Sequence, residues 1–542
     1  MRIAHEALGP AAAFAIALLF TNICDAAKAG TVDEIRTSVE ELLSTGELRI
    51  DGATISAQSP LSEFYIRRHF TPAWTLAAAE AWLDWLATID AEGLRPDDYF
   101  LRALARADPF GRGSADRDIL LTASLLRAAN DLRFGKVDPR IFDRSWNLPR
   151  PAADWDSATI AEGAIASGAP GPFVATMLPR PRLFLDLQTA LRSYREIAAQ
   201  GGWPLVPTGR TLRIGDVDAR VTALRRRLTI TSDYVEGPRA SGAGSPVSSA
   251  FDAELARAVR IFQERHGLKA DGAVGPATLA ALNVPVGERI DQIRLNLERG
   301  RWVFGNLAPR FLVVNTASFQ VFLVEHDTPI WSAPAVVGQY YRQTPTFRGE
   351  LEYLVLNPTW TIPPTILRED IVPLAKKEPG YLERMRIDVL TRDGRPVDPR
   401  VIDWERVGPR DFPYVLEQRA GPENLLGRVK FIFPNPFFVF LHDTPNKSLF
   451  SATQRTFSSG CIRVDDALGM AELVLDEPGW TRARLEAEVA TGRTQSVRLD
   501  RPLPVLVLYW TASVDARGRV RFLPDVYERD RQVLAALDAP AP

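Results

Sequence analysis

The sequence has little of the two residue types that most often hold metals or form cross-links. Its 542 residues include two cysteines and five histidines. No two of the histidines that follow the first thirty residues stand at the spacing that puts two metal ligands on one helix face. A structural zinc site usually takes two or more cysteines, and after the first thirty residues the sequence has a single one, Cys461. We therefore expect neither a metal nor another cofactor.

The chain also has no excess of charge of either sign. It carries 65 Lys and Arg residues against 67 Asp and Glu residues, a net charge of −2. Without a net positive field, binding to nucleic acid or to an anionic membrane surface is not expected. There is no Walker-type phosphate loop, and no Gly-x-Gly-x-x-Gly opens a helix after a strand. The composition is 46% hydrophobic, as in ordinary globular proteins, and the length indicates several domains.

The longest apolar run lies at the start of the chain, over residues 8–23, and it is short for a membrane span. Arg2 precedes it, Gly9-Pro10 interrupts it, and Ala27-Lys28-Ala29 after it is a small-x-small pattern. These features are typical of a cleaved export signal. We expect residues 1–29 to be a signal peptide, with an uncleaved inner-membrane anchor as the alternative.

Cleavage there would remove Cys24 and leave Cys461 as the only thiol. A lone cysteine in an exported protein has no internal disulfide partner, so it is either a reactive thiol or a small buried apolar residue. Its context favours reactivity. Ser458-Ser459-Gly460 precedes it directly, and His442 lies 19 residues before it.

A thiol needs a neighbouring base to become a good nucleophile, and His442 can supply one. A glycine beside the nucleophile allows close approach of a substrate carbonyl and leaves backbone N–H groups to face an oxyanion. The pattern therefore favours acyl transfer. It is not the Gly-x-Ser-x-Gly elbow of serine hydrolases, and His before Cys is the reverse of the papain-like order.

Hydrophobic periodicity divides the rest of the chain. Spacings of three and four predict helices over 32–43, 74–89 and 119–132, in a helical scaffold domain spanning residues 30–205. A smaller unit at 206–289 follows, with two helices, a Gly/Ser/Pro-rich insert at 236–249 and a short third helix. A charged helix at 290–302 begins a linker over 290–309.

From residue 311 the period changes to two, which predicts a mostly β domain over 310–530. Its insertion at 365–424 is helix-patterned and then turn-rich, and it is either a lid or a surface decoration. A terminal helix is expected at 528–537, and we assign 531–542 as a C-terminal tail. The fold class is α+β multidomain. Strands are expected at these segments: 311–314, 319–325, 331–337, 351–356, 429–433, 437–442 and 505–511.

Residues 212–284 resemble the small peptidoglycan-binding module of cell-wall enzymes. The motifs that carry the likeness are Phe262-Gln263, His266-Gly267-Leu268, Asp271-Gly272, Val274-Gly275 and Thr278-Leu279. The resemblance implies wall binding. A module that only spaces its neighbours is the alternative, because such modules sometimes lose their ligand.

The span from about 310 to 530 resembles the catalytic domain of L,D-transpeptidases. The matching residues are His442 with its flanks Leu441 to Pro445, Ser459-Gly460-Cys461, Arg463, and Asn357-Pro358-Thr359-Trp360. With the upstream regions, the likeness points to the large periplasmic subgroup of Gram-negative bacteria. Ser459 stands where many members of the family have a second histidine, although the large subgroup commonly has serine.

The resemblance implies two acyl transfers. Cys461, deprotonated by His442, attacks the diaminopimelate carbonyl of a tetrapeptide stem, and D-Ala leaves. The amine of a second diaminopimelate then resolves the thioester and forms a 3–3 cross-link. The N–H groups of Gly460 and Cys461 are the expected oxyanion donors, and the carbonyl of Asp443 would orient His442.

Four further residues are candidates for substrate binding. Arg463 either binds a stem carboxylate or braces the loop through Asp465 or Asp466. Trp360 either lines the cleft or packs in a core, and Ser458 and Ser459 are better suited to loop hydrogen bonds than to nucleophilic attack.

The motif does not distinguish transfer from hydrolysis. An L,D-carboxypeptidase or cross-link hydrolase would use the same Cys and His, and an inactive wall-binding scaffold is a third alternative. The expected partners are stem peptides as donor and acceptor, together with other wall synthases. Carbapenems are the expected covalent inhibitors, and the expected location is the periplasm.

Overall fold

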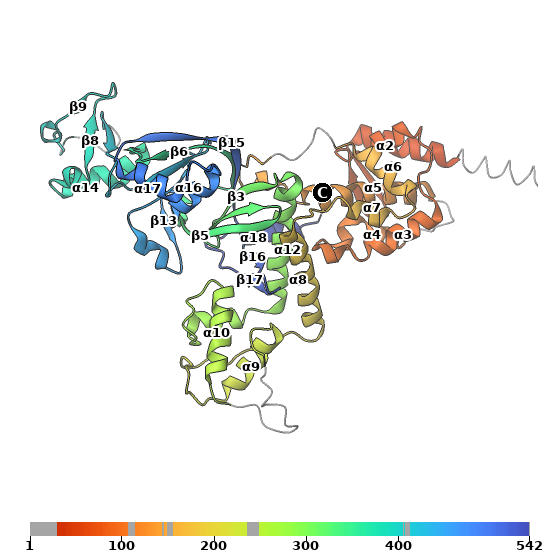
Figure 1. The fold of residues 1–542 in the computed structure, drawn as a ribbon. Coiled ribbons are helices and arrows are strands. Elements are labelled where there is room, and N and C mark those ends of the chain that lie inside the picture. Colours follow the sequence, from red (N-terminus) through yellow and green to blue (C-terminus); the bar gives the residue numbers. More distant parts are fainter. Residues whose placement is uncertain are drawn as a thin grey trace, which may run out of the picture.

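The computed structural model describes residues 30–106, 114–143, 146–148, 155–235, 249–404, 406 and 412–540. The expected signal peptide and most of the 236–249 insert lie outside these ranges. No helix in the described part is long and apolar enough to cross a membrane. The protein is an α+β multidomain protein, as expected, with three lobes that meet at the helices α8 and α12 (Figure 1).

The N-terminal lobe is helical, as the periodicity predicted, and α5 runs through its core. Trp82 is fully buried there, and its indole N–H donates to Ser124 of α5 at 3.1 Å. A β1–β2 hairpin was not predicted, because four-residue strands are too short to show a period. The elements are a helix at 30–45, β1 (Glu47–Ile50), β2 (Ala53–Ser56), α2 (Leu61–Arg67), α3 (Leu76–Leu86), η1 (Ile89–Glu92), η2 (Pro96–Tyr99), α4 (Leu101–Leu104), α5 (Ser114–Phe134), η3 (Pro139–Ile141), α6 (Ser157–Ala166), α7 (Pro170–Ala175) and α8 (Arg182–Ala199).

The second lobe consists of α9 (Arg220–Ile230), α10 (Ala253–Arg265) and α11 (Pro276–Leu282). Its motif residues hold the lobe together. The Gln263 amide donates to Asp271, to the Ala273 carbonyl and to Thr278 at 2.9–3.0 Å, and Gly267 ends α10 with φ +63°. These residues therefore specify the fold of the module, and they do not by themselves indicate a ligand.

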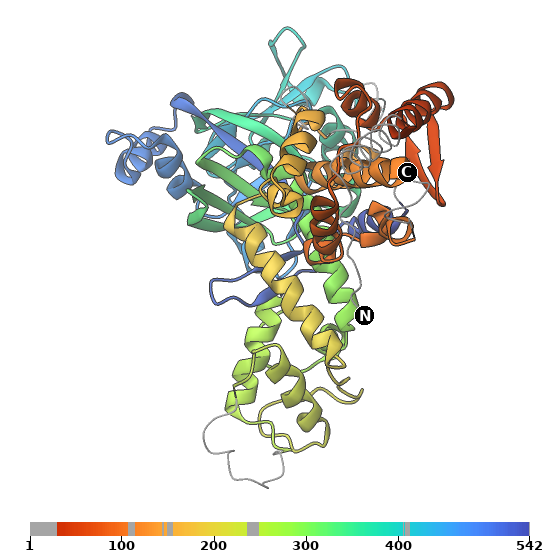
Figure 2. The ribbon, with the colours of Figure 1, turned by 90° about the vertical axis from the view of Figure 1, so that its right-hand side faces the viewer.

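The charged linker helix is α12 (Val286–Val303), and it is not an exposed connection. It packs along α8 at the centre of the molecule, where Figure 2 shows the two helices side by side. Its charges are neutralised inside the structure. Glu298 accepts from the backbone N–H of Val137 at 2.7 Å and pairs with Arg301, and both side chains are fully buried.

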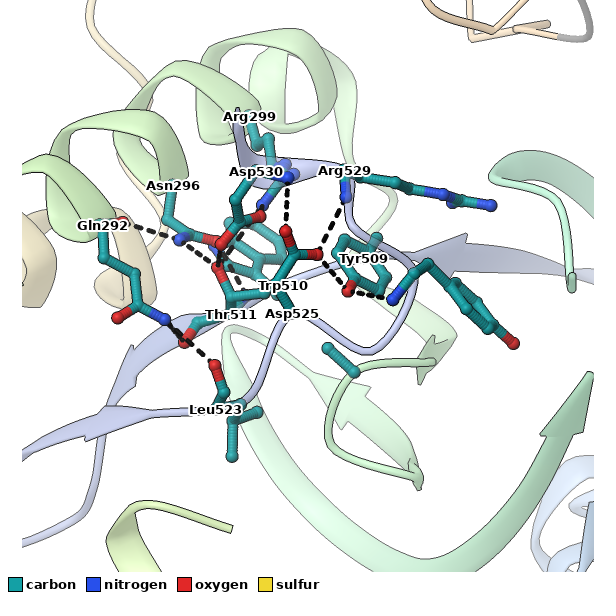
Figure 3. A network of polar contacts seen from close by, with 12 residues as sticks. Gln292, Asn296, Arg299, Tyr509, Trp510, Thr511, Leu523, Asp525, Arg529 and Asp530 are labelled. Atoms are coloured by element: carbon teal, nitrogen blue, oxygen red, sulfur yellow. Dashed lines mark hydrogen bonds and ion pairs between the residues drawn. The ribbon is translucent and has the colours of Figure 1, made fainter. Parts of the chain in front are cut away.

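α12 also binds the C-terminal segment of the chain (Figure 3). The amide of Asn296 bonds both the side chain and the backbone of Thr511 at 2.9 and 3.0 Å, and Arg299 pairs with Asp530 at 2.7 Å. The terminal helix is α18 (Asp530–Asp538). Lys136 of the N-terminal lobe donates to the carbonyls of Leu537 and Ala539. The expected terminal helix at 528–537 is thus present, and residues 531–540 are docked on the N-terminal lobe.

The third lobe is a nine-stranded mixed sheet with the order β13-β5-β14-β12-β11-β6-β15-β3-β4. β5 also pairs with β4, so the sheet closes on itself. The strand expected at 437–442 is only two residues long, because Phe438 has φ +55° and Asn435 bonds the Val439 backbone across the turn. The strands are β3 (Arg310–Asn315), β4 (Gln320–Glu325), β5 (Thr328–Gly338), β6 (Phe347–Leu356), β11 (Val429–Ile432), β12 (Leu441–His442), β13 (Thr456–Ser458), β14 (Ile462–Val464) and β15 (Gln495–Leu508).

Short elements complete this lobe. The helix expected after Cys461 is α16, and it packs on the sheet core. The remaining elements are η5 (Phe304–Asn306), η6 (Tyr340–Arg342), η9 (Lys447–Ser451), α16 (Ala467–Leu475), α17 (Arg482–Ala490), β16 (Ala512–Val514) and β17 (Val520–Phe522). The β16–β17 hairpin packs against α8 and the second lobe, because Phe522 lies edge-on to Tyr194 of α8 and against His266 of the second lobe.

The insertion forms a subdomain with its own sheet, β7-β10-β8-β9, and its own apolar core. It lies at the end of the third lobe farthest from the helical N-terminal lobe (Figure 1). Its first part is helical, as the pattern indicated, but strands β8 and β10 were not expected. The elements are β7 (Trp360–Thr361), α13 (Pro364–Ile366), the π-helical η7 (Leu367–Ile371), α14 (Val372–Lys377), α15 (Tyr381–Arg384), β8 (Ile387–Leu390), β9 (Pro396–Val397), η8 (Pro399–Val401) and β10 (Val415–Gln418).

Candidate active site

Strand register places three charged or titratable side chains in one row. Lys430 of β11 lies opposite His442 of β12, which lies opposite Arg463 of β14. Directly opposed residues on neighbouring strands project from the same face of a sheet. Cys461 lies two positions before Arg463, so it is positioned on this same face. The two strands that flank the motif in sequence are therefore adjacent in space.

His442 is buried, with 4% of its surface exposed, and its tautomer is fixed by the backbone. Its Nδ1 lies 2.6 Å from the carbonyl oxygen of Asp443, which accepts the Nδ1 proton and leaves Nε2 unprotonated. Burial, together with the positive charge of Arg463, lowers the pKa of His442 to about 3. The imidazole is thus a neutral base at every ordinary pH.

Cys461 is partly exposed, and its Sγ lies 3.7 Å from the carbonyl oxygen of Phe438. Burial raises the pKa of the thiol, although the Phe440 backbone N–H and the charges of Lys430 and Arg463 act in the opposite direction. Among the described contacts, the thiol hydrogen bond goes to Phe438 and not to His442. The resting pair is therefore neutral, and its proton moves only when a substrate brings the thiol and the base together.

The loop before Cys461 is held by its own hydrogen bonds. Ser458 Oγ donates to the Cys461 carbonyl at 2.5 Å and accepts from the Gly460 N–H at 3.1 Å. The Gly460 N–H, one of the two expected oxyanion donors, is therefore engaged inside the loop. In the described part of the chain, the Cys461 N–H has no acceptor and is the better-placed donor. Gly460 itself has φ +113°, a conformation that other residues rarely adopt.

The segment after β5 holds this loop from the other side. Thr344 is fully buried, and its hydroxyl donates to the Gly460 carbonyl and accepts from the Gly338 N–H, both at 2.9 Å. Since a trans peptide points its C=O and its N–H in opposite directions, fixing the Gly460 carbonyl turns the Cys461 N–H away from Thr344. Tyr527 donates to the Gly338 carbonyl at 2.7 Å, and its backbone N–H donates at 3.0 Å to the hydroxyl of Tyr509, which belongs to the network of Figure 3.

The side chain of Asp443 anchors the backbone around His442. The carboxylate is 2% exposed and accepts from Arg428 at 3.0–3.1 Å and from Lys447 at 2.8 Å. Gly427 packs so closely beneath it that a Cβ there would lie 2.6 Å from the Asp443 Cβ. These contacts fix the backbone carbonyl that orients His442, as the sequence prediction requires.

Arg342 connects the catalytic loop to the insertion. Its guanidinium donates to Ser459 Oγ at 2.7 Å and to Asp370 at 2.8 Å, and it also pairs with Glu369. Both carboxylates belong to η7 of the insertion. Sequence reasoning missed this residue, because an isolated arginine in a turn carries no motif.

Arg463 does not make the bracing contacts that we considered. Asp466 pairs with Arg482 at 2.9 Å, and Lys447 is the cation near Asp465. Within the described residues the Arg463 side chain has no acceptor, and its Nε is fully shielded. The carboxylate-binding alternative is therefore the one that the contacts favour. Trp360 lies in β7 and packs partly buried against the core of the insertion.

Three family matches cover most of the described chain. Residues 309–482 match the family described as "L,D-transpeptidase catalytic domain". Residues 59–191 match "Scaffold domain", and residues 218–282 match "Putative peptidoglycan binding domain". The first match contains the whole His442–Cys461 motif.

Curated relatives agree with these matches. A Haemophilus influenzae protein named "Putative L,D-transpeptidase" is 36% identical over 222 residues, which are 41% of this chain and 45% of the relative. The Mycobacterium tuberculosis "N-acetylmuramoyl-L-alanine amidase CwlM" is 43% identical over 76 residues, 14% of this chain and 18% of the relative. The chain thus spans less than half the length of these relatives.

Solved structures add no argument. An L,D-transpeptidase from Xylanimonas cellulosilytica is 15% identical, with a TM-score of 0.18 over 56% of this chain and 99% of that chain. A Clostridium acetobutylicum protein, titled as a fused amidase, peptidase and wall-binding protein, is 11% identical, with a TM-score of 0.15 over 56% and 100%. TM-scores this low support no conclusion about the fold. The sequence matches nevertheless agree with one another, and residues 309–482 of the chain match an L,D-transpeptidase catalytic domain, next to regions that match a scaffold domain and a peptidoglycan-binding domain.

Proposed function

We propose that this protein forms 3–3 cross-links in peptidoglycan through a thioester on Cys461. The observation that carries the proposal is the neutral His442, buried and locked by the Asp443 carbonyl, in the strand next to the only described thiol. A neutral imidazole with a free Nε2 is the form needed to take the proton of Cys461. The location that fits this substrate is outside the cytoplasm, in the periplasm.

The acylation half-reaction begins when Cys461 Sγ attacks the diaminopimelate carbonyl of a tetrapeptide stem. His442 Nε2 takes the thiol proton and returns it to the departing D-Ala amine. The Cys461 N–H donates to the oxyanion, which breaks down to the thioester. In the second half-reaction the amine of another stem attacks, His442 removes its proton, and the thiol is regenerated.

A muropeptide assay tests the proposal. The purified protein is incubated with disaccharide-tetrapeptides, and the products are separated by chromatography and identified by mass spectrometry. Dimers joined between two diaminopimelates are expected, with one D-Ala released for each bond. Tripeptide monomers alone would show that water resolves the thioester, which is the carboxypeptidase alternative.

A covalent probe tests whether Cys461 can be acylated at all, independently of which substrate the protein uses. A carbapenem should add its mass to the wild-type protein, and Cys461→Ala should abolish the adduct. The unchanged thermal unfolding midpoint of Cys461→Ala would show that the loss is chemical. A wild-type protein that forms no adduct would leave the inactive scaffold as the remaining alternative.

A further inference from the structure

Two cations lie on either side of His442 in the sheet, and neither has an acidic partner among the described residues. Lys430 faces His442 from β11, and Arg463 faces it from β14. Within the part of the chain that the structure describes, the Lys430 ammonium lies over the face of the Phe440 ring at 4.0 Å and has no ion pair. Two half-buried charges without counter-ions are unusual, because desolvated cations are normally paired.

The acidic residues nearest in sequence are already used by other cations. Asp443 holds Arg428 and Lys447, and Asp466 holds Arg482. Among the described residues no carboxylate neutralises the two cations, so a ligand that carries one would find both charges free. The pKa values of Lys430 and Arg463 are both lowered, chiefly by burial, while the charge of Cys461 acts in the opposite direction. Both cations therefore lie within electrostatic reach of the thiol.

We propose that Lys430 and Arg463 form a subsite for the terminal carboxylate of the D-Ala residue that leaves the donor stem. This inference rests on the proposed function and adds the feature by which the donor is selected. Arg463 would hold the carboxylate with its planar fork, and Lys430 supplies a second positive charge.

Distances along the chain fit this assignment. Consecutive Cα atoms are about 3.8 Å apart, so the terminal carboxylate lies roughly one residue beyond the carbonyl that Cys461 attacks. Arg463 lies two positions after Cys461, about 7 Å along the same face at the usual rise of a strand. A donor extended along this face brings its carbonyl to the thiol and its carboxylate to the two cations.

The subsite also affects the chemistry. Arg463 and Lys430 both lower the pKa of the thiol and both keep His442 uncharged. A carboxylate that binds them offsets these charges. Since a negative charge beside His442 favours its protonated form, binding of the donor makes the imidazole a stronger base at the moment of attack.

The test compares two donors that differ only at the terminus. D-Ala release is measured for a tetrapeptide stem with a free carboxylate and for the same stem ending in a carboxamide, and each is fitted for kcat/KM. We expect the wild type to prefer the acid by at least tenfold. Lys430→Met and Arg463→Gln should lower kcat/KM for the acid at least tenfold more than for the amide, so the preference collapses.

Charge-preserving variants separate binding from folding. Lys430→Arg and Arg463→Lys should retain part of the preference, and Lys269→Met, an exposed lysine of the second lobe, should retain all of it. If Lys430→Met and Arg463→Gln lower kcat/KM equally for the acid and the amide, the preference for the acid is unchanged and the subsite is overturned. A carbapenem adduct on wild-type Cys461 keeps this failure distinct from failure of the proposed function, which would give no adduct.

Discussion

The hydroxyl of Thr344 donates to the carbonyl of Gly460 at 2.9 Å, and this single contact sets the direction of the Cys461 N–H. The two groups belong to one planar peptide, so holding the carbonyl aims the N–H at the opposite side. Thr344 does not touch the thiol. In the proposed reaction it is a positioning residue for the oxyanion donor, and no motif in the sequence marks it.

Thr344→Val should reduce acylation because the Gly460 carbonyl loses its donor and the peptide is free to rotate. Loss of one oxyanion donor typically costs about 10²–10³ in rate, and we expect a decrease near the lower figure. The measurement is the rate of carbapenem adduct formation by mass spectrometry. Thr344→Ser keeps the hydroxyl and should stay within about fivefold of wild type. Equal rates for Val and wild type would contradict the assignment.

The low pKa of His442 predicts an unusual pH profile. The base must be neutral, and with a pKa of about 3 it remains neutral as the pH falls from 7 to 5. The acylation rate should therefore be nearly flat over this range. A histidine with the ordinary pKa of about 6.5 would lose roughly thirtyfold by pH 5. Stopped-flow acylation by a carbapenem between pH 4.5 and 8 checks this, and a decline with a midpoint near 6.5 would show a normal imidazole.

The contacts of Arg342 predict that the insertion is held over the catalytic loop by a weak latch. Glu369 and Asp370 are about half exposed, at 54% and 43%, and exposed pairs of this kind contribute only ~0.2–1 kcal/mol each. The double change Glu369→Gln with Asp370→Asn should free the insertion and raise its amide hydrogen exchange several-fold while the sheet core stays protected.

The matched control for the latch is Glu378→Gln, which breaks an exposed pair with Arg384 inside the same insertion. It should leave the exchange of η7 unchanged. The salt dependence offers a second readout, because the wild type should approach the double variant as screening increases at 0.5 M salt. Identical exchange in all three proteins would show that apolar packing, and not Arg342, holds the insertion.

Gly460→Ala should strain the catalytic loop, because φ +113° is a conformation that side chains rarely adopt. Such strain costs on the order of 1–3 kcal/mol, which the short loop can relieve only by moving the Cys461 peptide. We expect a loss of acylation with a small decrease in the unfolding midpoint. Gly394→Ala is the control, with φ +85° in an open turn of the insertion. It should lower stability similarly and leave acylation intact.

Much of the fold followed from local patterns. The three helices predicted in the first lobe, the three-helix module and most strands of the third lobe lie where the periodicity placed them, whereas α8 and the shorter helices of the first lobe were not predicted. Short or interrupted elements did not, and the strand at His442 is two residues long because Asn435 and Phe438 turn the chain just before it. The sequence did not predict that α12 is buried, because its charged residues are neutralised by partners far away in sequence.

The sequence by itself predicted the nucleophile, the base and the resemblance to L,D-transpeptidases, because Cys461, His442 and Gly460 lie within 20 residues and their chemistry needs no distant partner. Only the tertiary structure decided what surrounds them. Lys430, Arg342 and Thr344 come from separate strands and turns, and strand order and register bring them to the site. Such pairings are long-range, so a one-dimensional pattern carries no record of them.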